Sequence, residues 1–204
     1  MTDCCHIIFV IIYTNAIMQK IYISRRKIIM SETNNSSLDK EQEQTTLKIE
    51  NEINENLTGE LQENALKFVE FLKTNGIMTN YAVSPIVFRY YDEAVCVVVL
   101  HPIYDDKLGW NVYLGDYDST ICRSEYEDFP IDEELKEFAW EHKHTCGNCG
   151  CGNQPGKRFK ILGKDFDNVC TSLMWFGNAD DKTLEKLMEL VKVWKLCIDD
   201  KRSN

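Results

Sequence analysis

One short loop constrains this chain more than any other feature, because it concentrates cysteine, histidine and glycine in the run His142-Lys-His144-Thr-Cys146-Gly-Asn-Cys149-Gly-Cys151-Gly-Asn. Thiolate and imidazole groups are the usual ligands of zinc, which takes about four of them in a tetrahedron. The two-residue gap between Cys146 and Cys149 is that of a zinc knuckle, and the glycines allow the tight turns such a loop needs. We therefore predict that this loop folds around a metal ion.

The ligand set is predicted to include one more cysteine, Cys170, which follows the loop in the sequence. We expect a structural zinc site made by Cys146, Cys149, Cys151 and Cys170, with His144 as the leading substitute. The set stays open because a second CxxC pair at zinc-ribbon spacing is missing. An iron–sulfur centre and free thiols in a glycine-rich turn are the alternatives without zinc.

A redox-active pair of Cys146 and Cys149 is a further alternative. Such a pair needs a thiol with a lowered pKa, typically at a helix N-terminus. This loop instead follows the end of a predicted helix, so the redox interpretation is disfavoured.

The number of cysteines and the net charge limit which cellular compartment and which classes of partner suit this chain. The chain has nine cysteines, an odd number that leaves one unpaired in any complete disulfide scheme. It has no convincing cleavable secretory signal, and we expect a reducing, cytoplasmic compartment. The net charge of −10 argues against nucleic-acid binding, which needs clustered lysine and arginine, and suits a cationic small molecule or a basic protein.

The first 29 residues differ from the rest, and we interpret 1–29 as a leader. Its apolar run within 7–24 is short of the roughly 17–25 residues of a membrane-spanning helix. We interpret the leader as translated upstream sequence of bacterial type, because Arg25-Arg26 can be encoded by AGG codons resembling a ribosome-binding sequence shortly before Met30. A membrane or targeting segment over 7–24 and a folded element are the alternatives.

Residues 30–56 are polar and charged, with apolar residues that look too sparse to form a face. Such a composition cannot bury enough apolar surface to offset the entropy of ordering. We expect a disordered polar tail here, with a frayed helix near its end as the alternative, followed by a single folded domain over 57–204.

Hydrophobic periodicity within 57–204 predicts helices and short strands. The expected helices are 58–75, 130–142 and 180–198. The expected strands are 86–91, 94–101, 110–114, 120–123, 158–162 and 169–176. Hairpins dominate this order and no βαβ alternation appears, so we predict an α+β fold with a mainly antiparallel sheet of about four to six strands and three helices.

Aromatic residues alternate with acids between the predicted strands, at Trp110, Tyr113, Tyr117 and Tyr126. An apolar cup edged by carboxylates would suit a cationic organic ligand through cation–π contacts. The alternative is simple strand alternation, with the aromatics in the core and the acids in water.

Catalytic fingerprints of the common hydrolase, protease and dinucleotide-binding types are missing from the sequence, which disfavours an enzyme. The favoured function is a small intracellular ligand- or partner-binding module with a structural zinc knuckle. The alternatives are a thiol oxidoreductase using Cys146 and Cys149, and an acidic protein that interacts with a basic partner.

Overall fold

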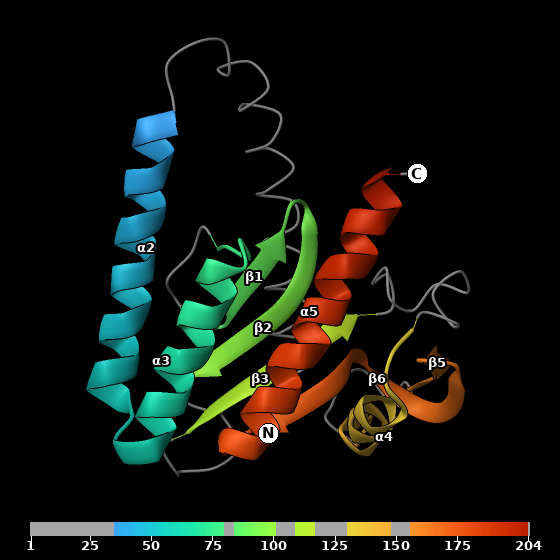
Figure 1. The fold of residues 1–204 in the computed structure, drawn as a ribbon. Coiled ribbons are helices and arrows are strands. Elements are labelled where there is room, and N and C mark those ends of the chain that lie inside the picture. The colour runs from blue at the N-terminus through green and yellow to red at the C-terminus, as the bar shows by residue number, and fades with distance from the viewer. Residues whose placement is uncertain (1–34, 80–83, 101–108, 117–129, 148–155, 204) are drawn as a thin grey trace.

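The computed structural model describes residues 35–79, 84–100, 109–116, 130–147 and 156–203 (Figure 1). The elements in chain order are α2 (Asn35–Asn56), α3 (Gly59–Thr74), β1 (Ile86–Tyr90), β2 (Glu93–Leu100), β3 (Trp110–Asp116), α4 (Glu133–Glu141), β4 (Lys143–Thr145), β5 (Lys157–Ile161), β6 (Lys164–Gly177) and α5 (Asp181–Ser203). The α+β class and the antiparallel sheet are confirmed. The described part contains six strands and four helices, one helix more than expected.

The sheet is organised around β6. The strand order is β1-β2-β3-β6-β4, with β5 paired to β6 outside this path, and each of these pairings is antiparallel. The second half of β6 lies between β3 and β4, whereas its first half forms a hairpin with β5. Val169 marks the change, because it pairs with both Thr145 of β4 and Lys157 of β5.

Strand β6 begins at Lys164, five residues before the predicted start at Val169. The reason is the turn that joins it to β5. Leu162 and Gly163 have φ values of 47° and 81°, and two consecutive positive φ angles are the requirement of a type I′ hairpin turn. This turn starts the pairing at once, with Ile161 opposite Lys164.

Strand β3 has a different partner from the one expected. It is paired along one edge by β2 and along the other by β6. Residues 120–123, the predicted hairpin partner of this strand, lie outside the described residues.

Helix α2 differs from the disordered tail expected over 30–56. Thr46, Ile49, Ile53 and Leu57 recur at helical spacing and are buried, so that few apolar residues suffice to form a stripe. Figure 1 shows α2 running alongside α3, which supplies the surface against which this stripe packs.

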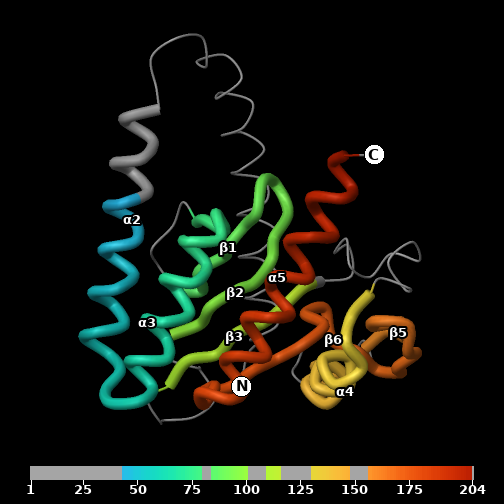
Figure 2. The backbone as a smooth tube through the Cα atoms, in the orientation of Figure 1, coloured from blue at the N-terminus to red at the C-terminus, as the bar shows by residue number. Residues whose placement is uncertain are grey.

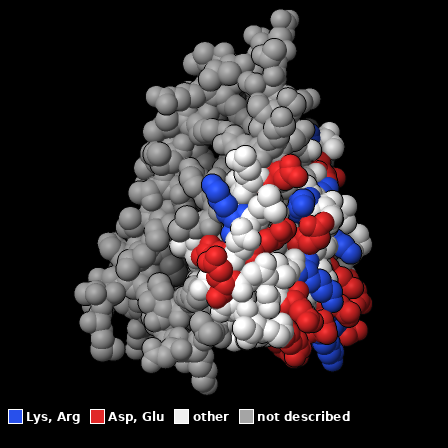
Figure 3. Space-filling view, turned by 90° about the vertical axis from the view of Figure 1, so that its left-hand side faces the viewer, with Lys and Arg blue, Asp and Glu red and all other residues white. Residues whose placement is uncertain are grey.

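The exposed side of the α2–α3 pair carries both signs of charge. Figure 3 shows acidic and basic side chains interspersed among the described residues on this face. Within the part of the chain that the structure describes, no helix combines the length and apolar character needed to cross a bilayer.

The core lies between the sheet and the helices α3 and α5, which run side by side across one face of the sheet (Figure 2). Strand β2 shows the alternation that builds this core. Cys96, Val98 and Leu100 are buried, while Val97 and Val99 between them are only half-buried.

A close approach between α5 and β3 fixes the spacing of these layers. Trp194 of α5 is fully buried, and a Cβ atom added at Gly115 would lie 2.4 Å from its ring. Gly115 also has a φ of +68°, a conformation that favours glycine. The indole can therefore press against the strand backbone only because this position has no side chain.

We expect Gly115→Ala to destabilise the protein more than Gly59→Ala, by at least about 1 kcal/mol. Both glycines have a positive φ, near +68° and +59°, so both substitutions strain the backbone, but Gly59 has no atom within 4 Å of an added Cβ. Urea unfolding followed by far-UV circular dichroism measures the difference. Equal losses would show that the contact with Trp194 does not limit the packing.

Candidate functional site

The cysteine loop leaves the sheet at the end of β4 and returns to it at the start of β5. Cys146 directly follows β4, and Gly156 directly precedes β5. Cys149 and Cys151 lie outside the described residues. The structure thus describes both ends of the loop and the strand β6 that holds them.

A single residue, Asn168 of β6, bonds both ends of the loop. The backbone N–H of Cys146 donates to the Asn168 carbonyl oxygen at 2.7 Å, and the Asn168 side-chain Nδ2 donates to the Cys146 carbonyl oxygen at 2.8 Å. The Gly156 N–H donates to the Asn168 side-chain Oδ1, also at 2.8 Å. We call this set of three bonds the Asn168 clamp, since it closes the loop at its base.

Local backbone geometry explains the residue types in the clamp. Asn168 has a φ of 58°, the left-handed conformation that asparagine tolerates better than most residues with a Cβ. A Cβ atom at Gly156 would lie 2.5 Å from backbone atoms of Asn168 and Val169. Glycine is therefore required where the loop rejoins the sheet.

Cys170 lies two residues beyond Asn168 on β6 and is buried. Because the Cys146 N–H bonds to the Asn168 carbonyl, Cys146 lies opposite Asn168 on the β4 side of the ladder, and Asn168 is two residues from Cys170 along β6. The fold thus brings the first cysteine of the loop and the later cysteine to the same corner of the sheet. Among the described residues, no three histidine, cysteine or acidic side chains form a metal-sized group.

The two histidines of the loop region have different environments. The Nδ1 atom of His144 lies 2.8 Å from the Ser172 hydroxyl, and its ring lies 5.6 Å from that of Tyr113. Burial lowers the pKa of His144, although the hydrogen bond with Ser172 acts in the opposite direction. A neutral imidazole with Nδ1 occupied leaves Nε2 as its metal-binding atom.

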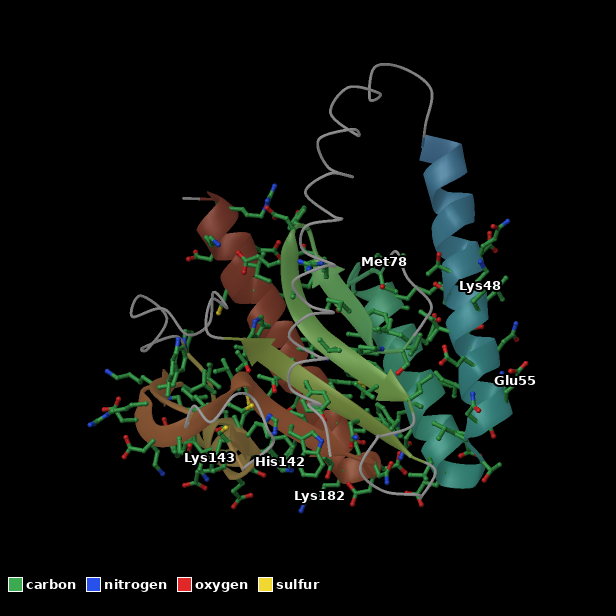
Figure 4. All side chains as sticks on the ribbon, turned by 180° about the vertical axis from the view of Figure 1, so that it is seen from behind. Lys48, Glu55, Met78, His142, Lys143 and Lys182 are labelled. Atoms are coloured by element: carbon green, nitrogen blue, oxygen red, sulfur yellow. The ribbon has the colours of Figure 1, made fainter. Side chains whose placement is uncertain are left out.

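His142 instead closes the end of α4. Its Nδ1 lies 2.8 Å from the carbonyl oxygen of Phe138, and its ring stacks on Phe176 at 4.8 Å. Figure 4 shows His142 and Lys143 at the end of the molecule opposite Lys48 and Glu55 of α2.

The two described residues of the predicted cationic cup, Trp110 and Tyr113, lie on opposite faces of strand β3. Trp110 is 1% exposed and lies 5.9 Å from Phe68 in the core, ring centre to ring centre. Tyr113 is three residues further along the same strand, which turns it to the other face, toward His144. Tyr117 and Tyr126 lie outside the described residues.

The cysteines of the core are poor nucleophiles. Burial raises the pKa of Cys96 strongly, and it raises the pKa of Cys197 to about 12. Cys146, at the base of the loop, is only half-buried. The structure therefore separates inert core thiols from a more accessible one.

The comparisons with known proteins do not extend this description. No family model matches the chain, and no curated protein or solved structure matches it.

The clamp can be tested with Asn168→Gly, which keeps the left-handed backbone and removes the two side-chain hydrogen bonds. We expect a loss of about 1–3 kcal/mol in unfolding free energy and faster hydrogen exchange at the Gly156 amide. Asn178→Gly is the matched control, because Asn178 also has a positive φ and its Oδ1 accepts a bond from the Trp110 N–H. Unchanged exchange at Gly156 in Asn168→Gly would show that the clamp does not hold the loop.

Thiol reactivity in metal-free protein should follow burial. We expect iodoacetamide to modify Cys146 at least about tenfold faster than Cys96 or Cys197, since one pKa unit changes the thiolate fraction about tenfold. Peptide mapping by mass spectrometry measures the three rates, and protein in denaturant should show them nearly equal. Fast labelling of Cys96 in the folded state would contradict the structure.

Proposed function

We propose that this protein is a small ligand- or partner-binding module whose cysteine corner is closed by a structural zinc ion. The observation that carries the proposal is the Asn168 clamp. It bonds both ends of the cysteine loop to Asn168, which lies two residues before Cys170 on β6. Residues distant in the sequence are thereby directed to one corner. The proposed ligands are Cys146, Cys149, Cys151 and Cys170, with His144 as the substitute.

The chemistry of these donors fits a zinc-like ion. Thiolates and a neutral imidazole are its preferred ligands, and a bound dication favours the deprotonated form of each thiol. The lowered pKa of His144 keeps its imidazole neutral at pH 7, as a ligand must be. Zinc would then connect β4, the loop and β6 through their side chains. The Asn168 clamp already connects the same three segments through hydrogen bonds.

A structural role is favoured over a catalytic one. A catalytic zinc keeps an open coordination position and usually has a carboxylate nearby to act as a base. The two acids of β6 nearest the corner, Asp165 and Asp167, lie 3.6 and 3.9 Å from Arg158 in ion pairs. Both carboxylates are exposed, and their described partner is Arg158.

The redox alternative receives no support from the placement of Cys146. This residue follows the end of strand β4, and it is not at the N-terminus of any helix that the structure describes, where a helix dipole favours a thiolate. We propose a cytoplasmic location, where clustered thiols remain reduced and available to a metal. A cationic small molecule or a basic protein remains the proposed partner, on the basis of the net charge of −10.

Metal analysis of the purified protein tests this proposal. We expect about one zinc ion per chain and a clear fall in melting temperature when a chelator removes it, because a structural site contributes directly to folding. Cys146→Ser and Cys149→Ser should each lower the zinc content below about 0.2 per chain.

Cys96→Val serves as the control for these substitutions, because Cys96 is buried in β2 on the helix-facing side. This variant should keep its full zinc content. Protein that contains almost no metal as purified, and whose melting temperature is the same in chelator, would eliminate the structural zinc site. Reversible oxidation of Cys146 and Cys149 in such protein would support the oxidoreductase instead.

A further inference from the structure

In the first half of β6, basic and acidic side chains lie on opposite faces of the strand, because alternate residues point in opposite directions. Lys164 and Phe166 lie on one face of the β5–β6 hairpin, since alternate residues of a strand share a face. Asp165 and Asp167 lie on the other, where both form ion pairs with Arg158. The carboxylates closest in sequence to Lys164 are thus directed away from it.

Four side chains form a compact group on the first of these faces, which we call the aromatic–lysine cluster: Trp140, Lys143, Lys164 and Phe166. The Nζ atoms of Lys143 and Lys164 each lie 5.4 Å from the centre of the Phe166 ring, and Lys164 Nζ lies 4.6 Å from that of Trp140. The two ammonium groups are therefore no further apart than twice 5.4 Å. Trp140 is fixed by its own N–H, which donates to the Ile161 carbonyl oxygen at 2.8 Å.

Among the residues that the structure describes, no acid forms an ion pair with either lysine of this cluster. Neither Lys143 nor Lys164 forms an ion pair or a hydrogen bond with any residue that the structure describes, and their contacts are with aromatic rings. Other lysines of the chain do have acidic partners, as in the pairs Lys67–Asp181, Lys136–Glu133, Lys186–Glu134 and Lys195–Asp199. An aromatic ring attracts an ammonium group but does not neutralise it, so its N–H donors remain available to an anion.

We propose that the aromatic–lysine cluster binds a phosphate group, either as free phosphate or as a small phosphate monoester. Two ammonium groups match the charge of about −1.5 to −2 that such a group carries at pH 7, whereas a carboxylate carries half as much. Lysine binds phosphate as a point charge, and the rings beside the two ammonium groups hold them near each other without neutralising them. The net charge of −10 disfavours an extended polyanion at the same place.

The test is a titration with inorganic phosphate at pH 7.5 and low ionic strength, followed by the backbone amide resonances of Lys143, Lys164 and Phe166. We expect saturable shifts with phosphate and weak, non-saturating ones with acetate at matched ionic strength. Lys143→Gln and Lys164→Gln should each weaken phosphate binding at least about fivefold, because each removes one of the two charges. A parallel titration with O-phosphoserine distinguishes the two sources, since tighter binding of the monoester would identify it as the preferred form.

Lys192→Gln is the matched control, because Lys192 also lies over a single aromatic ring, Phe71, at 5.7 Å. This variant should bind phosphate as the unchanged protein does. Far-UV circular dichroism and melting temperature verify that all three variants are folded. The proposal is overturned if acetate shifts the same resonances equally, if phosphate does not saturate them, or if Lys192→Gln weakens binding as much as the cluster variants.

Discussion

The architecture depends on one constraint: strand β6 exchanges its partners partway along its length. Its second half is a central strand between β3 and β4, whereas its first half turns out of the main sheet to pair with β5. Asn168, with its positive φ, stands immediately before Val169, where the exchange occurs. The left-handed residue changes the course of the strand, and its side chain bonds the segments that the change brings close. The fold and the candidate site therefore share one cause.

The parts of the fold that could be predicted from sequence are those whose signals are local. Helices α3 and α5 have long apolar stripes, and β1 and β2 have strong strand composition around a short turn. Their bounds therefore agree closely with the predicted ones, except that α5 continues to Ser203, five residues beyond its predicted end. Helix α2 is predicted only as a frayed alternative near the end of a disordered tail, because Ile49 and Ile53 are sparse when counted along the chain. They become a buried stripe only when the partner helix is present, and composition alone does not reveal that partner.

The candidate site likewise has some features that local sequence predicts and others that depend on contacts between distant segments. Cysteine spacing pointed to the loop, but Asn168 and Gly156 were missed, because their roles consist of contacts between segments separated in sequence. An asparagine in a strand-like run is a weak signal of positive φ, and a glycine before a basic strand is weaker still. Of the four aromatic residues predicted together, Trp110 and Tyr113 are three residues apart on β3 and so face opposite sides, which exact strand bounds would indicate.

Strand β4 makes few backbone hydrogen bonds to β6, so this corner of the sheet needs other contacts to hold it in place. It has three residues, and its register is irregular: partners two residues apart on β4, Lys143 and Thr145, meet Met174 and Val169, five residues apart on β6. So short and interrupted a ladder contributes few backbone bonds, and isolated pairing of this length is marginal. The Asn168 clamp supplies part of the deficit, yet its bonds act only at the base of the loop. A metal ion bound by thiolates from both the loop and β6 would restrain the remainder, which is the physical reason to expect a cross-link here rather than elsewhere in the sheet.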